Sequence, residues 1–269
     1  MPELPEVETT RRGIAAWLEG VTPSEVRIHN PSLRWPIPPE LPQRLIGRPI
    51  TNVGRRAKYL LLHNERGTAL VHLGMSGSLR LSQPDEARRT HDHVEIPLAE
   101  RILRFNDPRR FGAWLWSTDP PQHPLLAPLG PEPLGTAFDG DHLYHRSRGR
   151  RASVKAFIMD AKIVVGVGNI YAAEALFMAG IHPQRPAGRV GRTRYRRLAD
   201  AIQQVLMNAI ELGGTTLRDF TDSQGNPGYF RQSLAVYGRE SEPCHRCGQP
   251  LRHRVIGQRS TVFCARCQR

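Results

Sequence analysis

The chain has 269 residues, of which 39% are hydrophobic, and this is enough for one large or two medium domains with their own cores. Lys and Arg number 38 against 25 Asp and Glu, a net charge of +13 that favours a polyanionic partner over a basic surface that only aids solubility. No apolar run reaches the roughly 18 residues of a membrane span, and the acidic, proline-bearing start is unlike a secretory signal, so we expect a cytoplasmic protein.

The first predicted element is a helix that begins at Pro5 and Glu6 and is closed by Gly20. Its apolar positions follow helical spacing: Val7, Ile14, Trp17 and Leu18. Short β-rich runs follow, each bounded by Gly, Pro or Asn: 26–28, 59–62, 69–73, 102–105 and 113–117. Several short strands after one helix indicate a β-sandwich or barrel-like first domain.

The proline-rich residues 119–135 are the predicted interdomain linker. Beyond them the pattern becomes helical. A short helix is expected over 170–179, stopped by Gly180. A longer one has an apolar stripe over 198–210 and ends at Gly213 and Gly214. The last stretch, 236–269, is a cysteine module, which completes an α+β chain.

All four cysteines lie in this module, in two pairs with two residues inside each pair: Cys244, Cys247, Cys264 and Cys267. In a cytoplasmic chain this spacing favours one tetrahedral zinc ion over disulfides, with a redox pair as the alternative. Four thiolates leave no open position for water, so the zinc is expected to be structural. The cations between the pairs, among them Arg254 and Arg259, are typical of a finger placed on DNA.

The N-terminus carries a possible nucleophile. Removal of Met1 before a small residue would leave Pro2 with a secondary amine, whose pKa of about 7.7 to 8 lies below the roughly 10.4 of lysine. Attack on a sugar C1′ would give an iminium that cannot lose its charge by N-deprotonation, and Glu3 could exchange protons with the opening ring. An ordinary helix start is the alternative for these two residues.

Two further segments are suited to a disturbed duplex. A tight turn at 107–112 would present Arg109, Arg110 and Phe111 together, and guanidiniums bind base edges or phosphates while a phenyl ring can wedge between bases. Glycines on both sides of Met75 would expose a flexible apolar probe. Each segment alone is equally compatible with a common turn or a hairpin with a core methionine.

The segment Gly166-Val167-Gly168 invites comparison with a dinucleotide fingerprint, but Tyr171 stands where the third glycine should be. We prefer a turn that leads into a helix N-terminus, which is a ready phosphate site, with Asn169 as an additional donor. No nucleotide cofactor is therefore expected.

Together these segments resemble the formamidopyrimidine-DNA glycosylase family. Residues 2–8 are similar to its N-terminal signature, and the resemblance continues in the family's order across essentially the whole chain, without a departure at a position that the family's chemistry requires. The further matching segments are 55–59, the glycine-flanked Met75, 106–112, 165–171, 213–217 and the four-cysteine finger.

The resemblance implies a fold of three parts. Residues 2–133 would be an N-terminal β-sandwich with the first helix, and 136–230 a helical domain with a helix–two-turn–helix element. Residues 236–269 would be a zinc finger hairpin. The family's lesion-capping loop would fall at about 215–229. Nothing indicates an oligomer surface, so a monomer is expected.

The resemblance also implies an activity: a bifunctional glycosylase and AP lyase that excises oxidised purines such as 8-oxoguanine from double-stranded DNA and cuts the strand by β,δ-elimination. Pro2 would form the Schiff base, Glu3 would be the general acid, Lys58 would assist β-elimination and Arg259 would bind phosphate and support δ-elimination. The implied backbone contacts are His91, Arg110, Arg151 and Asn169, and the implied fillers of the gap left by the flipped nucleotide are Met75, Arg109 and Phe111.

Two alternatives stay open. A sister enzyme of the endonuclease VIII type would use the same Pro-Glu chemistry on oxidised pyrimidines, although Leu4, Val7 and the turn with Arg109 resemble the purine enzyme. A zinc-dependent DNA-binding protein without catalysis would bind DNA in a salt-sensitive way and break no strands.

Overall fold

The computed structural model describes residues 2–214 and 233–269. The chain divides into two compact units. Of the described residues, the first comprises 2–127 and 212–214, and the second comprises 128–211 and 233–269. The predicted lesion-capping loop, 215–229, lies outside the described residues.

The first unit begins with helix α1, Leu4–Leu18. Proline in its first turn suits the helix start because the missing N–H would have no partner there. The helix buries an apolar face that includes Leu4, Val7 and Ile14. Gly20 follows with φ +83, a left-handed conformation that ends the helix at little energetic cost for glycine. The expected first helix is confirmed.

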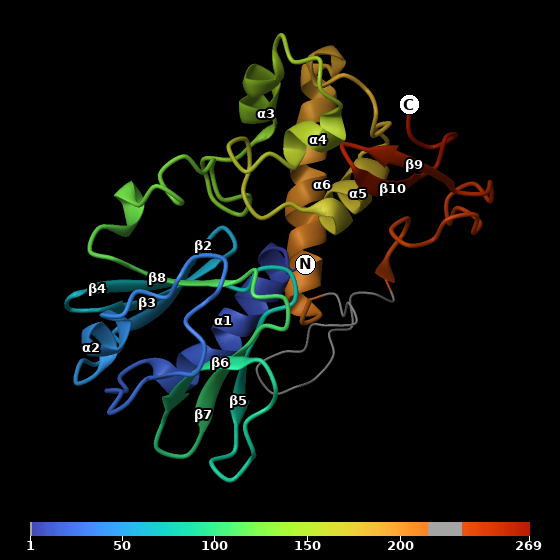
Figure 1. The fold of residues 1–269 in the computed structure, drawn as a ribbon. Helices are drawn as coiled ribbons and strands as arrows, with labels where there is room; N and C mark the ends of the chain where they lie inside the picture. Colours follow the sequence, from blue (N-terminus) through green and yellow to red (C-terminus); the bar gives the residue numbers. More distant parts are fainter. Residues whose placement is uncertain (1, 215–232) are drawn as a thin grey trace. The chain divides into compact units, whose positions relative to one another are not determined.

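Two four-stranded antiparallel sheets follow, with the orders β1-β6-β7-β5 and β2-β3-β4-β8 (Figure 1). Buried side chains from both sheets and from α1, among them Phe105, Trp114 and Ile14, form one core cluster. The expected β-sandwich is therefore confirmed. The bounds are β1 Arg27–Ile28, α2 Leu41–Leu45, β2 Asn52–Arg56, β3 Tyr59–Asn64, β4 Gly67–His72, β5 Ser78–Ser82, β6 Asp92–Pro97, β7 Ile102–Asn106, β8 Ala113–Ser117 and the 3-10 turn η1 Pro120–Gln122.

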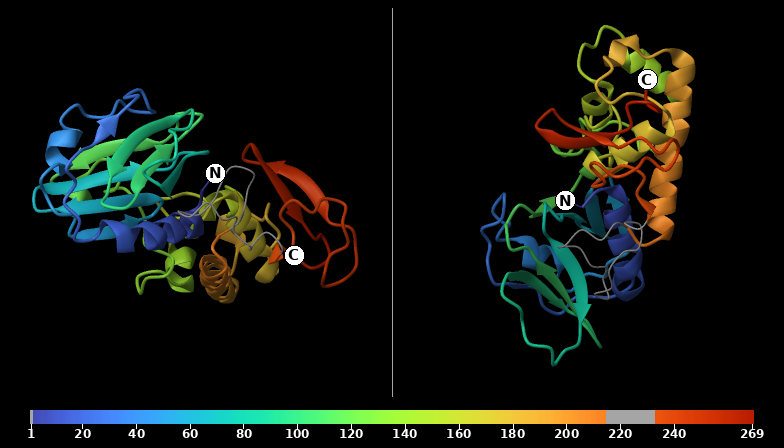
Figure 2. Two further views of the ribbon diagram at one scale, coloured as in Figure 1. Left: turned by 90° about the horizontal axis from the view of Figure 1, so that it is seen from below. Right: turned by 90° about the vertical axis from the view of Figure 1, so that its right-hand side faces the viewer.

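The second unit is helical with a C-terminal hairpin, and Figure 2 shows its long helix in orange and the hairpin in red. The expected helix over 170–179 is found as α5, one residue earlier, and the long helix ends before the two glycines as expected. Among the described residues, no helix has both the length and the apolar character needed to cross a membrane. The bounds are α3 Gly140–Ser147, α4 Val154–Ile158, α5 Asn169–Met178, η2 Ala187–Arg189, α6 Arg192–Glu211, β9 Arg252–Ile256 and β10 Arg259–Phe263.

The cysteine module packs on α5. Phe177 and Ala173 of this helix share an apolar cluster with Val262 and its neighbours. The buried Glu174 carboxylate accepts three backbone hydrogen bonds, from the N–H groups of residues 235–237, at 2.8 to 3.0 Å. Burial raises the pKa of Glu174 despite these bonds, because they offset only part of the desolvation. The chain segment that leads into the finger is thereby fixed to the helix.

Candidate functional site

The start of α1 holds the predicted nucleophile and acid. Pro2 is buried, and Glu3 at the N-cap is only 2% exposed. The Glu3 N–H donates to Glu6 Oε2 at 2.8 Å, as one half of a capping box. A Cβ atom on Gly214 would lie 3.3 Å from Glu6 Cγ, so this glycine lies directly against the first turn. Two carboxyl groups and the proline thus share one enclosed corner of the first unit.

Lys58 lies in the turn between β2 and β3, where Arg56 pairs with Tyr59 and Ala57 has φ 54. The turn is fixed to α1 by one arginine. Arg55 donates from Nε to Glu8 Oε2 at 3.0 Å and from Nη1 to the Ala57 carbonyl oxygen at 2.9 Å. The helix that carries Pro2 and the turn that carries Lys58 are therefore held together by a short polar chain.

Glu8 is the charged centre of this chain. Burial disfavours its charged form, but hydrogen bonds from Arg11, Arg55 and Arg12 outweigh this effect and lower the pKa of Glu8 to about 2. The carboxylate is therefore ionised throughout the neutral range and serves as a permanent anchor for the arginines.

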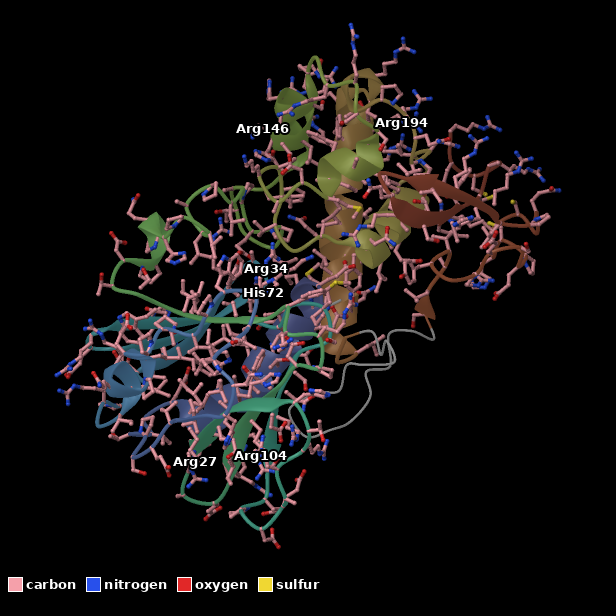
Figure 3. The ribbon with its side chains drawn as sticks, in the orientation of Figure 1. Arg27, Arg34, His72, Arg104, Arg146 and Arg194 are labelled. Atoms are coloured by element: carbon pink, nitrogen blue, oxygen red, sulfur yellow. The ribbon has the colours of Figure 1, made fainter. Side chains whose placement is uncertain are left out.

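His72 at the end of β4 is a residue to which sequence reasoning gave no role. Burial, together with the nearby charges of Lys58 and Arg34, lowers the pKa of His72 to about 4, so the ring is neutral at pH 7. Figure 3 shows His72 beside Arg34. Its Nδ1 accepts a hydrogen bond from the Gly74 N–H at 2.9 Å. The ring thus fixes the backbone of Gly74, the residue before Met75.

The predicted wedge residues are brought together. We name residues 73–77 the Met75 loop and residues 107–112 the Arg109 turn. A Cβ atom on Gly74 would lie 2.4 Å from the Phe111 carbonyl carbon, so the two segments are in backbone contact that only glycine permits. The Arg109 guanidinium lies 4.8 Å from the centroid of the Phe111 ring, which is 42% exposed, while Met75 is half-buried.

Two predicted backbone-contact residues flank the same region of the first unit. His91 and Arg110 are exposed and have positive φ values, 73 and 56. Such a conformation is uncommon for residues with a Cβ atom and is maintained here by surrounding contacts. The His91 carbonyl oxygen accepts a hydrogen bond from the Asp107 N–H at 3.0 Å. Because Asp107 opens the Arg109 turn, the turns that carry His91 and Arg110 adjoin each other.

Asn169 and Arg259 are brought together in the second unit. The Asn169 side chain accepts from Lys155 Nζ at 2.6 Å and donates from Nδ2 to the Ser260 carbonyl at 3.1 Å. Lys155, only 1% exposed, also donates to Thr261 Oγ1 at 2.7 Å. The N-terminus of α5 therefore holds the hairpin next to Arg259, which is exposed. Arg151 is exposed in the segment before α4.

The hairpin itself presents Arg259 by a tight turn. Gly257 and Gln258 occupy its two central positions, with φ values of 54 and 60. Arg259 pairs with Ile256 across the turn. Positive φ at both central residues is the geometry whose twist matches that of antiparallel strands. The turn leaves Arg259 at the exposed tip of the finger.

The four cysteines converge as predicted. Their sulfur atoms all lie within 4.8 Å of one another. Burial and the three neighbouring sulfurs raise the pKa of Cys267 to about 12. Thiolates so close together need a cation, and four sulfurs at these separations fit tetrahedral zinc, a structural site with no position for a substrate.

The predicted residues are divided between the two units. Three residues without a role in the sequence predictions, Asp107, Lys155 and His72, hold functional segments in place. Asp107 stands inside the matching segment 106–112, but its partner Ser76 lies 31 positions earlier, and Lys155 reaches Thr261, 106 positions later. The first unit carries Pro2, Glu3, Lys58, Met75, His91, Arg109, Arg110 and Phe111, and the second carries Arg151, Asn169, Arg259, Cys244, Cys247, Cys264 and Cys267.

Comparison with known families gives three matches along the chain. Residues 1–114 match the formamidopyrimidine-DNA glycosylase N-terminal domain, and 129–221 match the formamidopyrimidine-DNA glycosylase H2TH domain. Residues 241–269 match the zinc finger found in FPG and IleRS. Together these matches cover well over half of the chain.

Similar proteins cover the chain from end to end. The formamidopyrimidine-DNA glycosylases of Marinobacter nauticus and Syntrophotalea carbinolica are 59% and 60% identical, with all of each chain covered. A Lactococcus lactis FPG mutant bound to a Fapy-dG containing DNA is 32% identical with a TM-score of 0.93, covering 100% of both chains. The MutM (FPG) protein of Thermus thermophilus is 41% identical with a TM-score of 0.89, covering 99% of this chain and 98% of that one.

Proposed function

The chain belongs to the formamidopyrimidine-DNA glycosylase family, the DNA glycosylases of base excision repair, and we propose that it removes 8-oxoguanine and formamidopyrimidines and then cuts the strand as an AP lyase. The observation that carries the proposal is the enclosed start of α1, where Pro2 and Glu3 stand together and Glu6 closes the first turn. The proposed partner is double-stranded DNA that contains an oxidised purine, bound by a cytoplasmic monomer.

The chemistry starts from the Pro2 amine after Met1 is removed. The nitrogen bonds to C1′ of the damaged nucleotide while the glycosidic bond breaks, and Glu3 supplies the proton that the opening sugar ring requires. Because the amine is secondary, the product is an iminium that keeps its positive charge. This electron sink acidifies the C2′ hydrogen, so the 3′ phosphate leaves first and the 5′ phosphate follows.

Two cations act on these eliminations. Lys58 lies in a turn fixed to α1 through Arg55 and Glu8, which suits a role in β-elimination. Arg259 lies at the exposed tip of the finger hairpin and binds the phosphate that leaves in δ-elimination. In this proposal Asn169 has two roles. It contacts the DNA backbone, and its amide donates a hydrogen bond to the Ser260 carbonyl of the same hairpin.

Base extrusion accounts for the remaining residues. A nucleophile cannot reach C1′ while the base is stacked, and unstacking costs a few kcal/mol. Met75, Arg109 and Phe111 fill the gap, which the close contact of their two segments supports. His91, Arg110, Arg151 and Asn169 hold the kinked backbone, and a kinked duplex meets more of the cations that this basic chain offers.

The first experiment is borohydride trapping on a duplex with 8-oxoguanine opposite cytosine. A covalent complex mapped to Pro2, with a one-nucleoside gap flanked by phosphates, is the expected result. Trapping only on a duplex with oxidised thymine would instead support an endonuclease VIII-type enzyme. Tight binding without adduct or cleavage, although mass spectrometry shows a free Pro2 amine, would leave a zinc-dependent DNA-binding protein.

A further inference from the structure

Asp107 occupies an unusual position beneath the exposed turns of the first unit. It is fully buried, at 0% exposure, although it opens the highly exposed Arg109 turn. A buried carboxylate is stabilised only when its oxygens receive hydrogen bonds or an opposite charge. The donors that hydrogen-bond to the Asp107 carboxylate therefore indicate its structural role.

Both carboxylate oxygens accept from donors in different segments. Oδ1 accepts from the Ser76 hydroxyl at 3.0 Å, in the Met75 loop, and Oδ2 accepts from the Gly112 N–H at 2.7 Å, at the far end of the Arg109 turn. The two wedge segments are thus bridged by one side chain. Charge-assisted bonds of this kind are roughly twice as strong as bonds between neutral groups.

The backbone of the same residue reaches the third exposed turn. The Asp107 N–H donates to the His91 carbonyl at 3.0 Å, and its own carbonyl accepts from the Arg110 N–H at 3.2 Å and from His93 Nε2 at 2.8 Å. His91 and Arg110 are the two residues held at positive φ. One residue therefore contacts the three segments of the first unit to which the proposed function assigns DNA contacts.

Space in this region is tight enough to make the bridge effective. A Cβ atom on Gly112 would lie 2.6 Å from Phe105 Cζ and 3.0 Å from Asp107 Oδ2. The Arg109 turn therefore packs closely at Gly112, and the Asp107 bridge is one of the contacts that set its position relative to the Met75 loop.

We propose that Asp107 is a positioning residue that holds the Met75 loop, the Arg109 turn and the His91 turn in one arrangement, so that Met75, Arg109 and Phe111 enter the base stack as a single preformed wedge. This inference rests on the proposed function, since it assigns those residues to the gap left by the flipped nucleotide. Asp107 itself touches no DNA. Preorganised wedges bind more tightly because less conformational entropy is lost on insertion.

The test measures wedge insertion without chemistry. Each variant is bound to a duplex that carries a tetrahydrofuran abasic analogue with 2-aminopurine as the opposing base, whose fluorescence reports the loss of stacking. The variants are Asp107→Ala and Ser76→Ala, which break the bridge, and Ser117→Ala as the matched control. Ser117 also forms a side-chain hydrogen bond, to the Asp119 N–H, but at the opposite end of β8 from Gly112.

We expect the fluorescence change at saturating protein to fall by more than half in Asp107→Ala and Ser76→Ala and to stay at the wild-type value in Ser117→Ala. The double variant should be no worse than Asp107→Ala, because both substitutions remove the same bridge. Excision of 8-oxoguanine should fall on the order of 100-fold in Asp107→Ala, as small displacements of positioning groups do. Ser76→Ala keeps the test valid if Asp107→Ala does not fold.

Asp107→Asn separates positioning from direct chemistry. The amide oxygen can accept from Gly112 while the amide nitrogen donates to the Ser76 hydroxyl, so this variant should retain most of the fluorescence change. An Asn variant as defective as the Ala variant, or a full change in both bridge-breaking variants, overturns the inference. A wild-type chain that inserts its wedge but excises no base refutes the proposed function alone.

Discussion

Glu3 has two roles that a single substitution can separate. At the N-cap of α1 it belongs to a capping box with Glu6, and in the proposed chemistry it supplies a proton. Glutamine can accept the same backbone hydrogen bond but cannot donate an acidic proton. A capping role alone therefore predicts a small effect of the substitution, whereas general acid catalysis predicts a large one.

We expect Glu3→Gln to lower base release from 8-oxoguanine duplex by about 10²- to 10⁴-fold, the usual range for a general acid. Affinity for the duplex and the unfolding midpoint should change little, because the cap survives. Single-turnover excision, measured next to binding by fluorescence anisotropy, tests this. An unchanged excision rate would assign Glu3 to the helix cap alone.

At the scale of elements, α1 and the β2–β3 turn are joined through Glu8. The Glu8 side chain is 12% exposed and forms ion pairs with Arg11, Arg12 and Arg55. Its folded pKa of about 2 lies below the ordinary 4.5, so the ion pairs stabilise the fold fully above about pH 4.5. The contribution is lost as the pH falls from about 4.5 to about 2.

Glu8→Gln should therefore lower the free energy of unfolding by roughly 2 kcal/mol at pH 7, the scale of a hydrogen-bonded charge that is lost. The difference from wild type should shrink as the pH falls below about 4.5. Urea unfolding at several pH values measures it. Glu25→Gln, which removes an exposed partner of Arg27, is the control and should show little difference at any pH. A Glu8 effect that does not depend on pH would contradict the ionic explanation.

The finger is the second element with a sharp test. Cys247→Ser removes one zinc ligand, and because metal binding supplies the folding free energy of such a module, we expect zinc and DNA affinity to be lost together. Metal analysis of the purified variant and anisotropy with a damaged duplex measure the two quantities. His245→Ala, an exposed position between the first cysteine pair, should keep both. A full complement of zinc in Cys247→Ser would contradict a four-cysteine site.

The same scale shows how far local pattern predicts structure. All five expected strands form, but β2, β5 and β6 are not among them, because strands were expected from short apolar, β-rich runs and each of these three carries charged residues within it. In β5 and β6 these charges are buried in pairs. Arg80 meets Asp92 through two bonds of 2.7 Å, and Arg104 lies 2.9 Å from Glu95 on the sheet where Figure 3 labels Arg27 and Arg104. Such pairing becomes visible only when the strands are adjacent.

The candidate site shows the same limit. Pro2, Glu3 and the cysteines stand in short motifs whose chemistry follows from residue type and spacing. The residues that hold the site act over long sequence separations: Ser76 and Asp107 are 31 positions apart, and Lys155 and Thr261 are 106 apart. No local sequence pattern identifies a hydrogen-bond partner at such a separation. The Asp107 bridge between the two wedge segments and the Lys155 contact that supports the finger could therefore be found only from the fold.

For the whole molecule, the decisive property is charge. The net charge of +13 is carried largely by arginines, and both units contribute exposed cations that the proposed function places on phosphates, such as Arg110 and Arg259. Each phosphate contact releases condensed counterions when the complex forms. The logarithm of the binding constant therefore falls linearly with the logarithm of salt concentration, and the slope counts the contacts.

We expect Arg110→Ala and Arg259→Ala each to reduce that slope by about one on a duplex with a tetrahydrofuran site, since each removes one phosphate contact. Binding should weaken equally on damaged and undamaged duplex, because a phosphate carries no information about the base. Arg109→Ala is the informative comparison. As a wedge residue stacked on Phe111 it should leave the slope nearly unchanged and weaken damaged duplex more than undamaged. Titrations between about 50 and 200 mM salt measure all three. An unchanged slope for Arg259→Ala would show that Arg259 makes no phosphate contact. It would thereby contradict the role in δ-elimination proposed for this residue.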